Sequence, residues 1–138
     1  MASVSTYLNF MGDTEAAFSL YGRAFGSTMR GLQRMGEIPE GPELSDEEKM
    51  KVMHVELDIL GGHTLMATDM LESMGHQLRI GNNVTVSLQF DSREQADATY
   101  AILSENSTEA TGMSEMFWGY WGVCLDQFGV RWMFNVSS

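Results

Sequence analysis

The chain contains a single cysteine, Cys124, and two prolines in 138 residues. One cysteine excludes an internal disulfide, which is typical of proteins in a reducing compartment. No apolar run approaches the roughly 18 residues of a membrane span, and the N-terminus lacks the basic patch and apolar stretch of a signal peptide. We therefore expect a cytoplasmic protein with no membrane partner.

Positive charge is also scarce, since 8 lysines and arginines stand against 19 aspartates and glutamates, and the formal net charge is −11. Such a charge repels phosphate backbones, so we expect no nucleic-acid partner. The charge would favour a cationic ligand, although solubility explains it equally well. The length suits one domain with a sufficient core, and we expect residues 1–138 to form a single domain.

The two halves of the chain carry similar signals in the same order. Leu8-Asn9-Phe10 is followed by Ala16, and Leu88-Gln89-Phe90 is followed at the same spacing by Ala96. A second matched piece comes later in each half: Leu57-Asp58, Gly62 and Met66 in the first, and Leu125-Asp126, Gly129 and Met133 in the second. A period of roughly 70 to 80 residues is too long for a solenoid and predicts a duplicated module. The seam between two copies is a natural place for a ligand cleft.

The first module, at about residues 1–70, shows the signals of a strand, a helix and three further strands. Acidic Asp13 and Glu15 favour a helix start, and Gly26 fits a left-handed cap at its end. Alternation over residues 50–59 places His54 and Glu56 on one side of a half-buried strand. We expect the other strands at 4–10, 28–34 and 64–68, a hairpin turn at 61–62, and a solvated loop or short surface helix over 36–49.

A linker at about residues 70–82 leads into the second module, at about 83–138, which repeats this order. Ser92 and Gln95 form a capping-box pattern at the start of a helix that runs to about Leu103. We expect strands at 84–90, 108–113, 118–126 and 130–136, with a turn at 127–129. Asp69 and Asp126 each follow an apolar stretch, and turn formation explains both.

The ordered set of motifs extends over nearly the whole chain. It comprises Tyr7-Leu8-Asn9-Phe10, Tyr21 with Phe25-Gly26, Met53-His54-Val55-Glu56-Leu57, Leu65-Met66-Ala67-Thr68-Asp69, Trp118-Gly119 and Asp126-Gln127-Phe128-Gly129-Val130-Arg131-Trp132-Met133. In this order the set resembles the vicinal oxygen chelate superfamily of glyoxalases, bleomycin resistance proteins and dioxygenases, and within it the PhnB-like branch. The resemblance implies an α+β fold in which two βαβββ modules form an eight-stranded, cup-shaped mixed sheet with helices on its convex side. It also implies a homodimer.

In such a fold, alternation along each strand places apolar residues under the helices and their neighbours inside the cup. The polar set that we expect from the first module comprises Tyr7, Asn9, His54, Glu56, Met66 and Thr68. The set from the second module, partly by correspondence between the repeats, comprises Thr85, Ser87, Gln89, Tyr120, Gly122, Cys124, Arg131, Met133 and Asn135. An error of one residue in register would invert the contribution of a whole strand.

Many members of the superfamily hold one metal ion with His or Glu from the first, fourth, fifth and eighth strands of the cup. The corresponding positions here are Ser5 (or Thr6), Met66, Thr85 and Met133. Hydroxyls and thioethers are poor ligands for divalent ions of intermediate or hard character. We therefore predict that the usual metal site is absent, and we expect no other cofactor.

His54 and Glu56 lie two residues apart on one predicted strand, so their side chains project from the same face, roughly 6–7 Å apart along the backbone. Three interpretations stay open: a polar pair lining a pocket, two ligands of a displaced metal with Cys124 as a third, and a hydrogen-bonded structural pair. The pair could also catalyse, because an imidazole exchanges protons near neutral pH and a carboxylate can orient it. We expect His63 and His76 to be exposed.

Three functions are compatible with these signals. The one we favour is a metal-free protein that binds a small organic ligand, such as a toxic or antibiotic-like molecule. The second is a lyase, isomerase or epimerase that acts on a small oxygenated metabolite through His54 and Glu56, directly or with a displaced metal. The third is a dimer that acts through protein partners. Analogy of fold is the main support for each.

Overall fold

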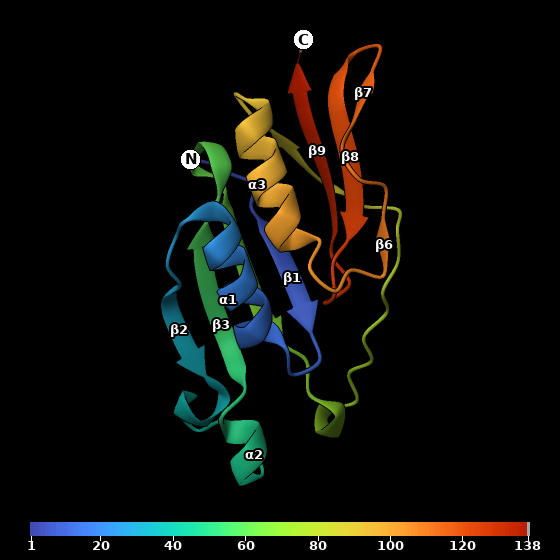
Figure 1. Cartoon of the computed structure of the whole chain (residues 1–138). Helices are drawn as coiled ribbons and strands as arrows, with labels where there is room; N and C mark the ends of the chain where they lie inside the picture. The colour runs from blue at the N-terminus through green and yellow to red at the C-terminus, as the bar shows by residue number, and fades with distance from the viewer. Residues whose placement is uncertain (138) are drawn as a thin grey trace. The chain divides into compact units, whose positions relative to one another are not determined.

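A computed structural model describes residues 1–137, and the chain divides into two compact units, Met1–Leu78 and Arg79–Ser138. The division falls inside the segment 70–82 that the sequence predicts as a linker. Each unit has its own sheet and its own long helix (Figure 1). In the part of the chain that is described, no helix has the length and apolar character needed to cross a bilayer.

The first unit has the predicted order of strand, helix and three strands. Its elements are β1 (Thr6–Phe10), α1 (Thr14–Phe25), β2 (Arg30–Arg34), β3 (Val52–Asp58) and β4 (Thr64–Asp69). Short helical turns at Met35–Glu37, Asp46–Lys49 (α2), Leu60–Gly62 and Glu72–Met74 fill the connections. The strands lie in the order β1-β4-β3-β2; β1 is parallel to β4 and the other pairs are antiparallel.

Helix α1 ends as the sequence predicts and covers one face of this sheet. Gly26 adopts a left-handed conformation with φ 64°, and its N–H donates to the carbonyl of Gly22. The helix buries Ala17, Phe18 and Tyr21 completely. Opposite them, the strands bury Phe10, Val55, Leu57, Leu65 and Ala67. Burial of each large apolar side chain contributes about 1.5–3 kcal/mol, so this layer holds the unit together.

The second unit follows the same plan with one departure. Its elements are β5 (Val86–Gln89), α3 (Arg93–Leu103), β6 (Glu109–Ala110), β7 (Ser114–Met116), β8 (Gly119–Leu125) and β9 (Arg131–Ser137). The strands lie in the order β5-β9-β8-β6, and β7 also pairs with β8. The strand predicted over 108–113 is shorter than expected, because β6 ends at Ala110 before Gly112, whose φ is 75°, and β7 is a separate strand that begins after it. The α+β class and the two-module plan are confirmed.

The start of α3 confirms half of the predicted capping box. The hydroxyl of Ser92 accepts a hydrogen bond from the backbone N–H of Gln95 at 3.1 Å. The side chain of Gln95 accepts from the N–H of Asp91 at 3.4 Å, one residue before the expected partner. The two hydrogen bonds are still reciprocal, because the N–H of Asp91, like that of Ser92, lies ahead of the first turn and has no acceptor within the helix.

Two buried aspartates occupy similar places, Asp69 as the last residue of β4 and Asp126 directly after β8. Oδ1 of Asp69 accepts hydrogen bonds from the N–H groups of Gly12 and Thr14, and its Oδ2 accepts one from Val52. Oδ1 of Asp126 accepts from two N–H groups of the β8–β9 turn, and its Oδ2 accepts from Nε1 of Trp132. Turn formation explains Asp126, as predicted. Asp69 does more, because it ties the loop before α1 to the start of β3.

Candidate functional site

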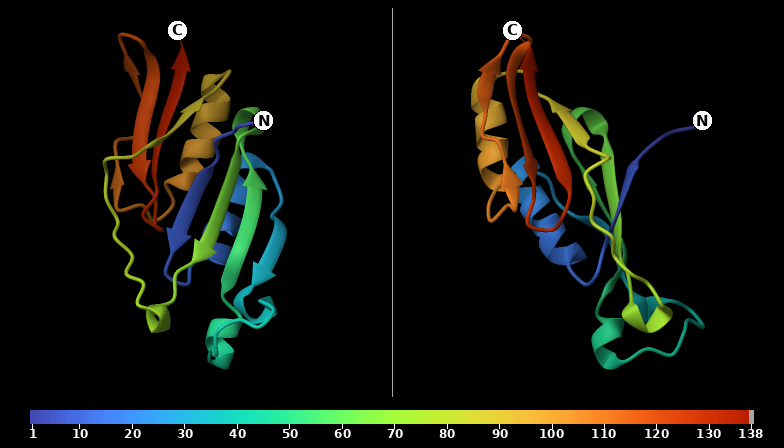
Figure 2. Two further views of the ribbon diagram at one scale, coloured as in Figure 1. Left: turned by 180° about the vertical axis from the view of Figure 1, so that it is seen from behind. Right: turned by 90° about the vertical axis from the view of Figure 1, so that its right-hand side faces the viewer.

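Helix α1 lies on one side of the first sheet (Figure 2). Polar side chains gather on the other side of that sheet. Tyr7 on β1 pairs with Met66 on β4, which pairs with Glu56 on β3, which pairs with Arg30 on β2. The next row contains Asn9 beside Thr68 and His54 beside Gln33. All six residues predicted for the first module therefore share one face. We call this surface, made by Tyr7, Asn9, Arg30, His54, Glu56, Asp58, Met66 and Thr68, the polar face of unit 1.

His54 is the centre of a hydrogen-bonded chain on this face. Its Nε2 lies 3.0 Å from Oε2 of Glu56, and its Nδ1 lies 3.2 Å from the hydroxyl of Tyr7. The rings of Tyr7 and His54 are tilted with centroids 5.8 Å apart. An ionised carboxylate only accepts, so the neutral imidazole carries its hydrogen on Nε2 and accepts the Tyr7 O–H at Nδ1. The ring thereby connects a phenol to a carboxylate.

Arg30 extends this chain, and the sequence did not mark it as a site residue. Its Nη2 lies 3.2 Å from Oε1 of Glu56, and its Nη1 donates to Oδ2 of Asp58. Oδ1 of Asp58 in turn accepts from the hydroxyl of Thr64 at 3.0 Å. Arg30 is brought to this face by the antiparallel pairing of β2 with β3, and the sequence carried no signal for that register.

Electrostatics favour ionised carboxylates and a protonated phenol in this chain. The hydrogen bond from His54 lowers the pKa of Glu56, partial desolvation opposes it, and Arg30 lowers it further. The pKa of Asp58 is lowered first by its hydrogen bond from Arg30 and then by Thr64. Partial burial raises the pKa of Tyr7. The side chains of His54 and Glu56 are 25% and 27% exposed, so a bound molecule could contact both.

The second sheet has a comparable face on the side opposite α3. Ser87 pairs with Met133 and Gln89 with Asn135, which confirms that these residues share a face. The amide of Asn135 donates to Oε1 of Gln89 at 2.8 Å, and Nε2 of Gln89 donates to the hydroxyl of Ser137 at 3.1 Å. Thr85, just before β5, accepts a hydrogen bond from Arg131.

The predicted positions of Tyr120, Gly122 and Cys124 on this face are wrong. Tyr120 pairs with Val136 and Cys124 with Trp132, and all of these lie on the side of α3. The Tyr120 hydroxyl donates to Asp97 of α3 at 2.6 Å, which confirms its side. The residues of β8 that share the face of Met133 are Trp121, Val123 and Leu125.

A one-residue shift between the repeats explains the error. Asp58 pairs with Thr64 in the first hairpin, whereas Leu125 pairs with Arg131 in the second. Leu125 is thus the counterpart of Asp58, and matching the two Leu-Asp dipeptides displaces β8 by one position. Because side chains alternate along a strand, one position inverts the whole strand.

Cys124 is completely buried, and its chemistry follows from that position. Desolvation, with a smaller effect from Asp126, raises the pKa of its thiol to about 12. A neutral thiol buried under α3 is a poor metal ligand and a poor nucleophile.

The residues at the superfamily's metal positions do not suit a divalent ion. Met66 and Met133 offer thioethers, and Thr85 offers a hydroxyl that already accepts from Arg131. Thr6 Oγ1 lies 2.8 Å from Nε2 of His63, so this histidine is half-buried rather than exposed as predicted. Across residues 1–137, no three His, Cys, Asp or Glu side chains gather closely enough to hold a metal.

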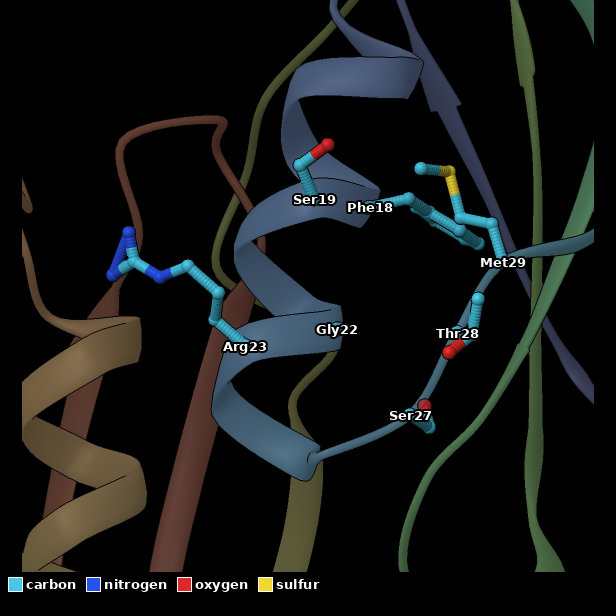
Figure 3. Close-up of a pocket in the computed structure, with 7 residues that line it drawn as sticks. All are labelled: Phe18, Ser19, Gly22, Arg23, Ser27, Thr28 and Met29. Carbon is cyan, nitrogen blue, oxygen red and sulfur yellow. The ribbon is translucent and has the colours of Figure 1, made fainter.

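Two further features of the first unit are of less functional interest. His76 is exposed, as predicted, and its Nδ1 accepts the N–H of Leu71 at 2.9 Å, a bond that shapes the local turn. A shallow depression of about 400 Å³ lies beside the second half of α1 (Figure 3). Its lining consists of Phe18, Ser19, Gly22, Arg23, Ser27, Thr28 and Met29. These residues include no acid and no histidine, so the depression lacks the paired groups of the polar face.

Comparison with known proteins places these features in context. The model of the family described as Glyoxalase/Bleomycin resistance protein/Dioxygenase superfamily matches residues 4–134. Protein YjdN of Escherichia coli is 25% identical, over 96% of this chain and 94% of its own. The crystal structure of protein PA1353 from Pseudomonas aeruginosa is 29% identical with a TM-score of 0.84, covering 99% of this chain and 98% of that one. The PhnB protein from Bacillus cereus shares the fold, with a TM-score of 0.79 at 19% identity over 99% of this chain and 100% of its own.

Proposed function

Since the chain belongs to the Glyoxalase/Bleomycin resistance protein/Dioxygenase superfamily, we propose that it binds a small organic ligand without the metal site usual in that superfamily. The observation that carries this proposal is the half-exposed chain from Tyr7 through His54 and Glu56 to Arg30. Polar groups that converge on one face and are already oriented by one another are typical of ligand sites, because they lose little freedom on binding.

The ligand-binding side chains differ in what they offer. Tyr7, Asn9 and Thr68 supply hydrogen-bonding groups from β1 and β4 of the polar face of unit 1, and Met66, paired with Tyr7 in the same row, offers an adaptable apolar contact. In unit 2, Ser87 and Gln89 of β5 and Thr85 just before it lie on the same face as Met133. Each of these two sets suits a small molecule that is partly apolar and carries several polar atoms.

The metal-free part of the proposal rests on donor chemistry. Two thioethers and two hydroxyls occupy the positions that would have to hold the ion. Thioethers prefer soft ions such as Cu(I), and neutral hydroxyls bind weakly on their own. The polar face would then act on its ligand through hydrogen bonds alone. We further propose that the protein is a homodimer, as the superfamily resemblance implies, and that it is cytoplasmic, as its single cysteine suggests.

A second candidate function, supported by the geometry of His54, is a lyase or isomerase that acts on a small oxygenated metabolite. A proton from a C–H or O–H group of the metabolite would move to Nδ1 of His54, once the Tyr7 hydroxyl turns away. The negative charge of Glu56, next to Nε2, would stabilise the imidazolium that forms. Arg30 would act as a positioning residue, because it holds Glu56 from the far side.

Four measurements test the proposal. Elemental analysis of purified protein should find less than one divalent metal ion per chain; one zinc, nickel, iron or manganese per chain that is lost in His54→Ala would overturn the metal-free assignment. Thermal-shift screening of cationic aromatic drugs and small oxygenated metabolites should identify a stabilising compound, because a ligand that prefers the folded state raises Tm. Its binding should perturb the NMR signals of Tyr7, His54 and Glu56. No rise in Tm with any compound of either set would contradict ligand binding.

Light scattering at micromolar concentration should give the mass of a dimer, and a monomer would contradict the proposed assembly.

A further inference from the structure

Arg131 stands at the start of β9, on the face of the second sheet opposite α3. It forms a row with Leu125 of β8 on one side and Thr85 on the other, and its Nη1 donates to the Thr85 hydroxyl. The residue is half-buried. One hydroxyl occupies a single donor of a guanidinium that has five, so most of its hydrogen-bonding capacity points elsewhere.

The charge environment of Arg131 differs from that of other arginines in the chain. Arg30, Arg34 and Arg93 each contact a carboxylate, from Glu56 and Asp58, from Glu15 and from Glu115 respectively. Among the described residues of unit 2, no carboxylate forms an ion pair with Arg131. A half-buried cation without a counter-ion is costly, and an anionic group from outside would remove that cost.

The surroundings define the kind of molecule that fits. Ser87 and Met133 form the next row, so the Thr85 and Ser87 hydroxyls lie on one side of β9. The half-buried side chains of Leu125 and Met133 add apolar surface within the same two rows. Rows on one face of a strand are about 7 Å apart, which is the length of a small organic acid.

We propose that Arg131, together with the hydroxyls of Thr85 and Ser87, binds the carboxylate or phosphonate group of a small organic acid whose apolar part contacts Leu125 and Met133. This inference rests on the proposed ligand-binding function and names the chemical class of the ligand. The net charge of −11 repels an anionic ligand at long range but does not prevent its binding to Arg131. At physiological salt, charges farther than about 8 Å are largely screened, whereas the guanidinium contact is direct.

NMR titration of the ¹⁵N-labelled protein tests the inference with three probes: benzoate, phenylphosphonate and neutral benzyl alcohol. We expect one or both anions to shift the Arg131 Nε–H signal and the backbone signals of Thr85 and Ser87, and benzyl alcohol to leave them unchanged. The anion that acts identifies the head group. Arg131→Gln should weaken anion binding about tenfold or more, which is the loss expected for one charge-assisted contact.

Arg79→Gln is the matched control, because Arg79 is an exposed arginine of the same unit. Equal weakening of anion binding by Arg79→Gln and Arg131→Gln would overturn the inference, as would equal shifts with benzyl alcohol. No response to either anion at about 10 mM, which is tenfold above a Kd of roughly 1 mM, would also overturn it. If Arg131→Gln does not fold, Thr85→Val and the wild-type Arg131 signal still decide the matter. Anion shifts confined to Tyr7, His54 and Glu56 would overturn the role of Arg131 and leave the proposed function standing.

Discussion

The hydroxyl of Tyr7 lies 3.2 Å from Nδ1 of His54, although 47 residues separate the two in the chain. Because Nε2 of the same ring is directed at Glu56, the hydrogen of the phenol is directed at the imidazole. The oxygen of Tyr7 therefore keeps its lone pairs available to a hydrogen-bond donor from outside. At this point the polar face of unit 1 offers an acceptor to a ligand.

The tautomer of His54 is the first prediction. We expect the neutral ring to carry its hydrogen on Nε2, with Nδ1 unprotonated, because only Glu56 requires a donor. Long-range ¹H–¹⁵N NMR of imidazole-labelled protein distinguishes the two forms, and His54→Gln identifies the signals against those of His63 and His76. Tyr7→Phe should keep this tautomer and cost about 1 kcal/mol or less, since the lost bond is partly exposed. A dominant Nδ1–H form would contradict the assigned direction of the chain.

The second prediction concerns the acidity of Glu56. His54→Ala should raise the pKa of Glu56, because the hydrogen bond from His54 is the largest single influence that lowers it, and Arg30→Gln should raise it as well. The ordinary value is 4.5, and the folded pKa lies below it. The stability that this shift contributes is therefore present above pH 4.5 and is lost as pH falls through the folded value. Carboxyl ¹³C NMR titration measures each pKa, and equal values in wild type and His54→Ala would refute the linkage.

The third prediction is that Cys124 is chemically inert in the folded protein. Its raised pKa of about 12 and complete burial leave almost no thiolate, so iodoacetamide should not modify it at pH 8. The same protein in denaturant should react at once, which serves as the control. Because the unfolded thiol ionises near pH 9, the related stability is full below pH 9 and is lost as pH rises towards 12. Rapid modification under native conditions would show that the thiol is accessible.

The fourth prediction concerns the buried carboxylate of Asp69. Asp69→Ala removes the acceptor of three backbone N–H groups and should lower the free energy of unfolding by about 3 kcal/mol or more. Asp13→Ala is the matched control, because Asp13 stands at the start of the same helix, is exposed and makes no side-chain cap bond. Urea denaturation monitored by circular dichroism measures both. A similar small change in the two variants would mean that water replaces Asp69 as the acceptor.

Strand alternation allowed a correct prediction of the polar face of unit 1. The pattern from Met53 to Leu57 is long and regular, so it specifies which side each residue takes. The same reasoning failed on β8, because the repeat was aligned on Leu-Asp dipeptides that are not equivalent. Tyr120 and Cys124 are also compatible with either side of a strand, so their chemistry could not reveal the error.

The amino-acid sequence by itself determined the α+β class, the doubled order of elements, the caps of α1 and α3, and the residue types available at the superfamily's metal positions. These follow from local periodicity and chemistry, which act within a few residues of the chain. The contacts that define the candidate site were decided by tertiary structure alone. Tyr7 with His54, Arg30 with Glu56, and Arg131 with Thr85 are brought together by strand pairing, and the register of paired strands depends on turn lengths and packing that no local pattern records.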